Sequence, residues 1–473
     1  MLLSSAITGA HAGAHAEDFG VTVDRMLAEK SLALFGIARP LAESAAESAD
    51  EGYRMPDHKA GDTIALAEGL TAEFLTRNGA QDFDMMTFYP AENPTHLVGC
   101  IEGDRAEIEP GKMNPGVQTV SLADGTVTTI VRGTNWCDGI RTTAWGTVFF
   151  SEEDDLGLGY EILNPLAITT AVDVKDRVTG ETSDPAAVRR WAALPTMAWE
   201  GIGILPDGTL YAGDELRPGT DIVGADGGAI FKFVPATPAS GMITTLDASP
   251  FAAGKTYAMQ VQCLHDKVQF GQGCETGTAI WIEVDPRKAR ADANEKGATG
   301  YYRPEDLHVD PVYAGEGVRF CWANTGREAA QNYAEVMCAI DQPASIPVAD
   351  AEGKIAMTTV VSRFIAGDVQ ANSFDNLEFQ PGTGILYVIE DHDNGDIWAC
   401  LPDGADRDVM TDGCIRTASV KDSSAEPTGF IFSADGSTAY VAIQHSDDTA
   451  MAMVDGYRSD DVLVIKGFAP VAK

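Results

Sequence analysis

The sequence predicts an all-β protein, a β-propeller preceded by an N-terminal helical extension. Short apolar runs separated by turn sequences such as Pro-Asp-Gly and Ala-Asp-Gly begin near residue 62 and continue to the end of the chain. A unit of apolar strand, glycine-containing turn and apolar strand recurs at residues 204–211, 379–387 and 432–440. Repetition of one hairpin is typical of propeller blades, and an assembly of two-sheet sandwiches is the alternative.

The chain divides into three regions by composition. Residues 1–16 are rich in alanine and end in Ala14-His15-Ala16, the small-x-small form of a secretory cleavage site, so we interpret them as a signal-peptide remnant. Residues 17–61 carry a helical pattern of apolar side chains, interrupted near Pro40, and are predicted to form an extension on the outside of the main body. Residues 62–473 form the predicted propeller of a secreted or periplasmic protein.

Acidic side chains dominate the charge of the protein. The 473 residues include 33 lysines and arginines against 71 aspartates and glutamates, which gives a formal net charge of −38. So acidic a protein repels nucleic acid and anionic lipid. A salty extracellular setting and the binding of divalent cations both fit this charge. No apolar run approaches the roughly 20 residues of a membrane-spanning helix.

Six of the eight cysteines fall into three close pairs, and none has the paired Cys-x-x-Cys spacing of a zinc site. In an exported protein such pairs predict disulfides. The predicted pairs are Cys263 with Cys274, Cys321 with Cys338, and Cys400 with Cys414. Cys100 and Cys137 remain. Either they bond to each other, or Cys137 is a free thiolate with another role.

Clusters of acids follow or begin several predicted strands. The run at 152–155 follows an apolar strand, and packing negative charge so densely is unfavourable unless cations or water surround it. A solvated acidic turn is the simplest explanation for one such run, but similar acids recur. The later ones are Glu200 with Asp214 and Glu215, Glu305, Asp375 with Asp391, and Glu426.

Each of these acids alone would also serve to cap a turn. Equivalent ends of successive propeller blades converge on one central face, however, and acids that meet there are tolerable only around metal ions. Hard oxygen ligands favour calcium or another hard cation, whereas a thiolate from Cys137 in the same cluster would indicate a transition metal. The sequence lacks the G-x-S-x-G, G-x-x-x-x-G-K-[ST] and H-E-x-x-H motifs, which argues against a serine hydrolase, a P-loop NTPase and a zincin.

Taken together, these segments resemble the PhoX-type alkaline phosphatases and their wider family of secreted propellers. The resemblance covers residues 62 to about 450 and rests on the order and spacing of WGT…SEED, WEGIGILPDGTLYAGDE, RPEDLHVDP, FDNLEFQPGTGILYVIED and EPTGFIFSADGSTAYVAIQH. It implies a six-bladed propeller with a buried cluster of ferric and calcium ions, which hydrolyses phosphate monoesters outside the cytoplasm. The expected partners are small-molecule phosphate esters, and we expect a monomer.

The resemblance also implies a role for each candidate residue. Arg303 would hold the substrate phosphate as the catalytic residue. The implied metal ligands are Cys137, as a thiolate ligand of iron, and the carboxylates of Glu153, Glu200, Glu305, Asp375 and Glu426. Further candidates for the site are Glu152, Asp214, Glu215 and Asp391.

Two other functions fit the same residues. A calcium-stabilised binding or scaffold propeller without catalysis is one, because the sequence around Cys137 and Glu200 departs from the family pattern, with Trp199 in place of a histidine before Glu200. A calcium-dependent lactonase-like hydrolase is the other, and it would need one metal ion with an acid or histidine base beside it.

Overall fold

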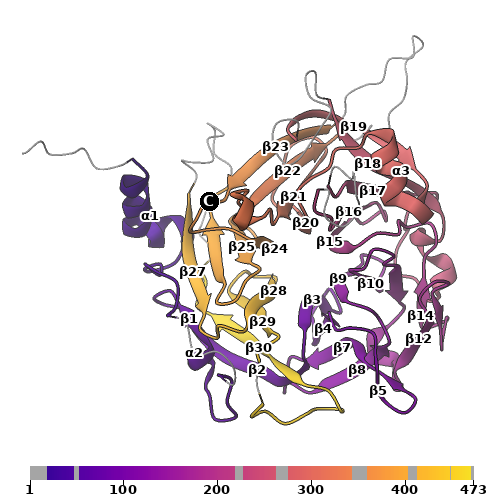
Figure 1. The fold of residues 1–473 in the computed structure, drawn as a ribbon, viewed down its shortest axis with the longest axis horizontal. Helices are drawn as coiled ribbons and strands as arrows, with labels where there is room; N and C mark the ends of the chain where they lie inside the picture. Colours follow the sequence, from indigo (N-terminus) through magenta and orange to yellow (C-terminus); the bar gives the residue numbers. More distant parts are fainter. Residues whose placement is uncertain are drawn as a thin grey trace, which may run out of the picture.

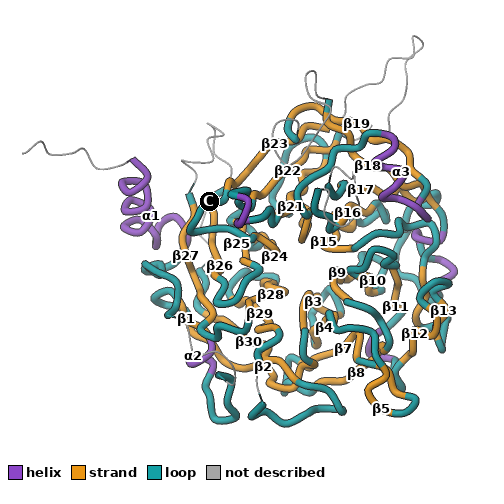
Figure 2. Tube along the Cα trace, in the orientation of Figure 1, coloured by secondary structure: helices purple, strands orange, loops and turns teal. Residues whose placement is uncertain are grey.

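The computed structural model describes residues 19–46, 53–218, 227–262, 275–342, 359–402, 413–447 and 449–469. Within these ranges, β-sheets are arranged around a central opening and extend from it to the rim (Figure 1). Strands and loops make up nearly all of the ring, and the longer helices lie at its outside (Figure 2). The predicted all-β, propeller-like class is therefore confirmed.

Four of the sheets reach the central opening with one strand each. The first runs outward through β3 (Phe83–Tyr89), β4 (His96–Ile101), β7 (Pro115–Ser121), β8 (Val127–Arg132), β12 (Val172–Asp176) and β13 (Glu181–Thr182). The second runs through β9 (Cys137–Thr142), β10 (Val148–Glu152), β11 (Gly159–Ile162) and β14 (Val188–Arg190). The third runs through β24 (Phe374–Phe379), β25 (Leu386–Glu390), β26 (Asp396–Cys400), β27 (Cys414–Val420) and β1 (Ile64–Leu66). The fourth runs through β28 (Glu426–Phe432), β29 (Thr438–Gln444), β30 (Ser459–Lys466) and β2 (Thr71–Ala80).

A larger sheet reaches the opening at both of its ends. It runs through β15 (Trp199–Ile204), β16 (Leu210–Asp214), β17 (Ile230–Pro235), β18 (Gly254–Val261), β19 (Gly277–Val284), β23 (Thr359–Ala366), β22 (Glu335–Asp341), β21 (Val318–Asn324) and β20 (Pro304–Val309). The resemblance implies six blades, but the described sheets do not separate into six, because β19 and β23 pair at the rim and join the two halves of this sheet. The small hairpin of β5 (Glu107–Glu109) and β6 (Lys112–Met113) stands apart.

The innermost strands contact one another in a closed ring, in the order β3, β9, β15, β20, β24, β28 and back to β3. Buried apolar side chains fill the space between neighbouring sheets, as Val98 and Val117 do against Phe150 and Tyr160. The ring is closed by the two ends of the chain, because β2 pairs antiparallel with the last strand, β30.

The predicted N-terminal helix is present as α1 (Phe19–Phe35), which lies outside the ring beside β27 (Figure 1). It ends before Gly36, whose φ of +71° is the left-handed conformation that commonly stops a helix, so the helix is shorter than the pattern up to Pro40 suggested. The other helices are α2 (Ala60–Thr63), α3 (Ala289–Lys296) and the 3-10 turns Pro165–Ala167, Leu246–Ala248, Pro250–Ala252, Pro286–Lys288 and Glu328–Ala330. In the described ranges, every helix is too short or too polar to cross a lipid bilayer.

Two of the predicted disulfides are confirmed. Cys321–Cys338 joins β21 to β22, and Cys400–Cys414 joins β26 to β27, each between directly opposite residues. The predicted pair of Cys263 and Cys274 lies outside the described residues.

A buried ion pair joins the two halves of the nine-stranded sheet away from its inner ends. Asp341 accepts hydrogen bonds from Lys232 Nζ at 2.6 Å, Tyr211 Oη at 2.6 Å, Trp281 Nε1 at 3.0 Å and Thr359 Oγ1 at 2.9 Å. A buried carboxylate is tolerated when its charge is paired and its lone pairs are all used, as they are here.

Candidate metal centre

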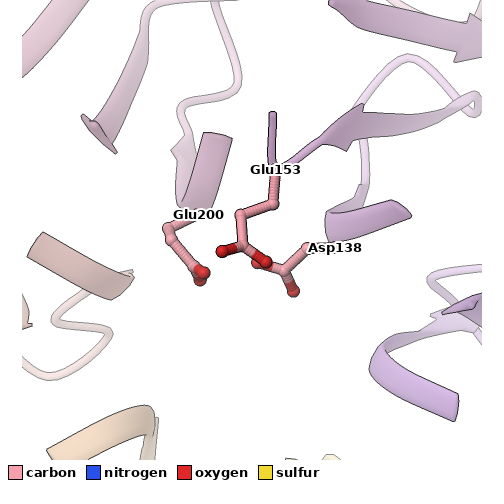
Figure 3. Close-up of side chains that lie close together, drawn as sticks. All are labelled: Asp138, Glu153 and Glu200. Atoms are coloured by element: carbon pink, nitrogen blue, oxygen red, sulfur yellow. The ribbon is translucent and has the colours of Figure 1, made fainter. Parts of the chain in front are cut away.

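Carboxylates from the inner strands meet at the centre of the ring. Oxygen atoms of Asp138, Glu153 and Glu200 lie within 4.8 Å of one another, and so do those of Glu200, Glu305 and Asp375. Figure 3 shows the first three side chains pointing toward one another from separate strands and loops. Glu200 belongs to both groups, so the five acids form one continuous cluster. We refer to these five residues as the axial cluster.

A β-bulge in the inner strand explains why four of the five acids point inward, whereas Glu153 directly follows β10. In five inner strands, two consecutive residues lie opposite a single residue of the next strand outward, and the first of the two is an acid. The five pairs are Asp84-Met85, Asp138-Gly139, Glu200-Gly201, Glu305-Asp306 and Asp375-Asn376. A bulge bends a strand and redirects its side chains, so the repeated bulge brings acids from different sheets to one face. In the sixth inner strand, β28, the bulged pair is Gly429-Phe430.

The backbone that precedes four of these bulges also has the same conformation. The residue two positions before the acid has a φ between +49° and +65° at Asp82, Trp136, Arg303 and Ser373. A left-handed backbone costs a residue other than glycine about 1–2 kcal/mol. Such strain, repeated at equivalent positions around one site, is typical of a functional site whose geometry the surrounding fold enforces.

Burial makes the negative charge of the axial cluster costly. It raises the pKa of Glu153, Glu200, Glu305 and Asp375 well above their usual values, and neighbouring carboxylates raise each of them further. Burial likewise raises the pKa of Asp138 to about 7. Both carboxylate oxygens of Asp138 and Oε2 of Glu305 are buried without a hydrogen-bond partner among the described residues. Buried, unpartnered and mutually repelling oxygens are the donor set that a hard cation fits.

The metal-free protein should lose stability as the pH rises from about 5 to 8. Burial raises the pKa of Asp138 to about 7 and that of Glu426 to about 8, so over this interval the native state holds more protons than the unfolded chain. Raising the pH therefore favours unfolding. We expect Tm in EDTA to fall across this range, and calcium to remove most of the fall because the cation takes the place of the protons. A Tm in EDTA that rises with pH, measured by calorimetry, would contradict this.

Arg303 lies at the edge of the axial cluster and is surrounded by acids. Its Nη1 is 2.7 Å from Asp391 Oδ2 and 2.9 Å from Glu305 Oε1, and its Nε donates to Glu215 Oε1. Burial alone would raise the pKa of the Asp391 carboxyl, but the Arg303 guanidinium outweighs it and the pKa falls to about 2. Within the described part of the chain these contacts use Nε and Nη1, which leaves Nη2 for an oxygen of a bound substrate.

The structure separates the predicted acids into those at the site and those elsewhere. Glu153, Glu200, Glu305 and Asp375 lie in the axial cluster, and Glu215 and Asp391 border it through Arg303. Glu426 lies beside Asp391 and accepts a hydrogen bond from His445 Nε2, at 3.0 Å. The other two candidates are ion-paired away from the cluster, Glu152 with Arg177 and Asp214 with Arg290.

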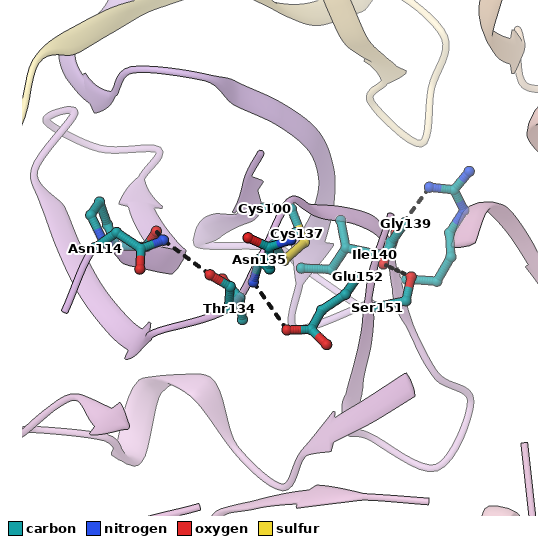
Figure 4. The surroundings of a disulfide bond; sticks show 11 residues. Cys100, Asn114, Thr134, Asn135, Cys137, Gly139, Ile140, Ser151 and Glu152 are labelled. Carbon is teal, nitrogen blue, oxygen red and sulfur yellow. Dashed lines mark hydrogen bonds between the residues drawn. A yellow bond between two sulfur atoms is a disulfide. The ribbon is translucent and has the colours of Figure 1, made fainter. Parts of the chain in front are cut away.

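Cys137 is not a thiolate in this structure, which corrects the ligand role that we expected for it. It forms a disulfide with Cys100, which was the first of the two alternatives for these cysteines (Figure 4). A sulfur bonded to another sulfur carries no thiolate charge for a metal ion. The next residue, Asp138, contributes its carboxylate to the axial cluster instead, so every donor in the cluster is an oxygen.

Three acids near the centre were missed by the sequence analysis. Asp138 directly follows Cys137, the residue that the resemblance implied as the ligand. Asp84, whose pKa is raised first by burial and then by Asp138 and Glu102, accepts a hydrogen bond from Thr428 Oγ1. Glu102 follows β4 and accepts a hydrogen bond from Gln444 Nε2, at 2.6 Å. The signal available for Asp84 was its position at the start of an apolar strand, which it shares with Glu200 and Asp375.

The fold and the site together define a propeller-like protein with a buried, axial cluster of carboxylates and an adjacent arginine. The family model described as "Alkaline phosphatase PhoX" matches residues 208–447, just over half of the chain, and the protein belongs to this family. No protein with curated annotation is matched by the chain.

One of the similar solved structures supports the architecture. PhoX of Pseudomonas fluorescens, in complex with the transition-state analogue vanadate, aligns with a TM-score of 0.57 at 16% identity, over 91% of this chain and 100% of that one. A putative oxidoreductase (glucose dehydrogenase) of Thermus thermophilus aligns with a TM-score of 0.44 at 12% identity, over 84% and 100%. A gluconolactonase of Xanthomonas campestris aligns with a TM-score of 0.40 at 11% identity, over 91% and 99%. The first of these likenesses shows the fold, and we base no argument on the other two.

Proposed function

We propose that this protein is an exported, metal-dependent phosphatase that hydrolyses small-molecule phosphate monoesters. The observation that carries the proposal is the axial cluster with Arg303 at its edge: five carboxylates that need cations, next to a guanidinium that can bind phosphate. Membership of the PhoX family and the vanadate bound to a relative of the same fold support the same reaction. The disulfides support export, because such bonds persist in oxidising compartments.

We also propose that the fold is a six-bladed propeller over residues 62–473. The nine-stranded sheet would then be two blades joined at the rim, one ending inside at β15 and the other at β20. The closed ring of inner strands and the bulge at the same position in each of them support this count.

The residues of the site suit calcium and a second hard cation such as ferric iron, which is the metal set that we propose. Asp138, Glu153, Glu200, Glu305 and Asp375 would hold the ions, with Glu426 and Asp391 at the edge. When bound, such ions supply Lewis-acid stabilisation of the charge on a phosphoryl group. The carboxylates would in turn be kept ionised by the ions, despite their burial.

The protein's own contribution to the reaction would be to position the substrate. Arg303 presents the N–H groups of Nη2 in the fixed plane of its guanidinium, where they can donate to phosphate oxygens. Glu215 and Asp391 fix its orientation from two sides, because each accepts a hydrogen bond from a different nitrogen. The buried surroundings strengthen the attraction between the guanidinium and the phosphate, and so favour the transition state in which charge develops on the phosphoryl oxygens.

Elemental analysis of the purified protein, with turnover of p-nitrophenyl phosphate measured on the same sample, tests this proposal. Calcium together with iron, and turnover that EDTA abolishes, is the expected result. Turnover that survives exhaustive removal of metal would overturn it.

A second candidate function is a calcium-stabilised propeller without catalysis. The disulfide at Cys137 favours it, because that disulfide removes the one soft ligand expected for iron. Calcium without iron, and no turnover of p-nitrophenyl phosphate, would establish this function in place of the first.

A further inference from the structure

We propose that Asp306 and Asn376 are positioning residues of the axial cluster, which hold the inner strands at the separation at which their carboxylates share cations. This inference rests on the proposed metal site but assigns residues that would touch neither metal nor substrate. Both are the second residue of a bulged pair, directly after Glu305 and Asp375. The same bulge that directs the acid to the axis directs the following side chain to the neighbouring inner strand.

Asp306 connects three of the strands that carry the cluster. Its side chain is 1% exposed. From β20, its Oδ2 accepts a hydrogen bond from the backbone nitrogen of Leu377 in β24, at 3.1 Å. Its Oδ1 accepts one from Arg141 Nη2 in β9, at 2.8 Å. β20, β24 and β9 carry Glu305, Asp375 and Asp138, respectively. The Asp306 carboxylate therefore links the three strands that set the distances among these three acids.

His308 completes this connection without reaching the cluster. Its Nε2 lies 2.9 Å from Asp306 Oδ2, and its Nδ1 lies 3.2 Å from Glu378 Oε2 on β24. Asp306 is therefore held by Arg141, His308 and the backbone nitrogen of Leu377, which are partners on β9, β20 and β24 that do not depend on a cation.

Asn376 makes the corresponding connection one strand further around the ring. From β24, its Oδ1 accepts hydrogen bonds from Thr428 Oγ1 at 2.8 Å and from the backbone nitrogen of Gly429 at 2.6 Å, both in β28. Its Nδ2 lies 3.7 Å from Met85 Sδ in β3. Asn376 is 2% exposed, so water does not compete with these contacts. It holds β24, which carries Asp375, against the strand that begins with Glu426.

At two other junctions between inner strands, of β9 with β15 and of β15 with β20, backbone contact takes the place of a side-chain connection. Gly139 and Gly201 are the second residues of their bulged pairs. A Cβ at Gly201 would lie 1.7 Å from the backbone nitrogen of Leu307, and one at Gly139 would lie 2.3 Å from the backbone oxygen of Glu200. No side chain fits at either place, so β9, β15 and β20 approach one another as closely as their backbones allow.

Electrostatics explains why such connections are needed. Five carboxylates, all buried except the half-buried Asp375, lie in two overlapping groups and repel one another. Separating the inner strands would relieve the repulsion at the cost of the cation site. The hydrogen bonds of Asn376, which is neutral, and of Asp306, whose charge is paired with Arg141, oppose that separation. Residues that orient metal ligands in this way typically change metal affinity or activity by about 10- to 100-fold when mutated.

The test measures calcium affinity, by calorimetric titration of EDTA-treated and desalted protein, for wild type, Asp306→Asn and Asn376→Ala. We expect each variant to bind calcium about 10- to 100-fold more weakly. Because the substrate contacts stay in place, the variants should lose kcat for p-nitrophenyl phosphate while KM changes little. The control is Asp341→Asn, which removes the charge of an equally buried, fully hydrogen-bonded aspartate in the same sheet as Asp306. The control should lower Tm without weakening calcium binding.

The outcomes separate this inference from the proposed function. A wild-type protein that binds no calcium overturns both. A wild type that binds calcium, with folded Asp306→Asn and Asn376→Ala variants that bind it equally well, overturns the positioning role alone. The positioning role is also overturned if the control Asp341→Asn weakens calcium binding as much as Asp306→Asn does. It is overturned as well if Asp341→Asn folds but Asp306→Asn and Asn376→Ala do not, because Asp306 and Asn376 would then serve general stability. If Asn376→Ala folds and Asp306→Asn does not, the calcium affinity of Asn376→Ala decides whether the positioning role holds.

Discussion

Replacing Arg303 with lysine should lower kcat/KM for p-nitrophenyl phosphate by about 10²- to 10³-fold, while the protein stays folded. Lysine keeps the positive charge among Glu215, Glu305 and Asp391, so the attraction that lowers the pKa of Glu215 and of Asp391 is largely preserved. It loses the planar group that keeps Nε and Nη1 on the surrounding carboxylates while Nη2 faces the phosphate, and a single ammonium does not replace that geometry. Steady-state kinetics on metal-loaded protein, with the metal content of each sample measured, provide the comparison.

Arg319→Lys is the matched control for this variant. Arg319 is similarly buried and is ion-paired, 2.7 Å from Asp310 Oδ2. It lies near the start of β21. The site is at the other end of that strand, where Asn324 pairs with Pro304, the residue next to Arg303. The control should retain wild-type kinetics. Equal kinetics for Arg303→Lys and wild type would remove Arg303 from the phosphate-binding role, and an equal loss in both variants would show that the effect is not specific to the site.

Several parts of the site could be predicted from the sequence because their signals are local. Glu200, Glu305 and Asp375 each stand at the end of a predicted strand, and an acid beside a buried strand is unusual enough to be noticed singly. The recurrence of that pattern along the chain then predicted their convergence. The pairs Cys321–Cys338 and Cys400–Cys414 were likewise predictable, because short separations within a hairpin place the two cysteines opposite each other.

The rest depends on features that no local pattern encodes. A bulge is a difference in register between two strands, and a positive φ at Trp136 or Arg303 follows from packing rather than from a glycine in the sequence. The run 152–155 shows the consequence. Its four acids look alike in the sequence, yet only Glu153 reaches the axial cluster, while Glu152 and Asp155 are paired with Arg177 and Arg290, residues that are distant along the chain. Partners supplied by the fold decide which carboxylate stays unpaired.

The fate of Cys137 has the same origin. Its separation of 37 residues from Cys100 gave no indication of pairing, and the resemblance favoured a free thiolate. In the fold, Cys100 is the single residue opposite the bulged pair of β3, and Cys137 directly precedes the bulged pair of β9. Since β3 and β9 are neighbours in the inner ring, the two sulfurs are brought together by the same bulges that direct Asp84 and Asp138 inward.

Replacing Glu305 with glutamine should have two effects of opposite sign. Activity toward p-nitrophenyl phosphate should fall by about 10²-fold or more, because a ligand is lost where bound cations would contribute several kcal/mol of transition-state stabilisation. In EDTA at pH 8, however, the variant should be more stable than wild type, by on the order of 1 kcal/mol, because one buried charge has been removed from a group of mutually repelling carboxylates. Burial raises the pKa of Glu305 well above its usual value, so this gain should shrink as the pH falls and the wild-type carboxyl becomes protonated.

Glu152→Gln is the matched control for Glu305→Gln. It measures the effect of removing a buried charge that does not belong to the axial cluster. Glu152 is fully buried and, like Glu305, is paired with an arginine, Arg177 at 3.0 Å, but it lies outside the axial cluster of repelling carboxylates. Its loss should therefore lower stability in EDTA and leave activity close to wild type, the reverse of the result at Glu305. Chemical denaturation with and without calcium, combined with kinetics, measures both quantities. Full activity in Glu305→Gln, or a metal-free Glu305→Gln protein less stable than wild type at pH 8, would show that Glu305 is not one of the repelling carboxylates of a cation site.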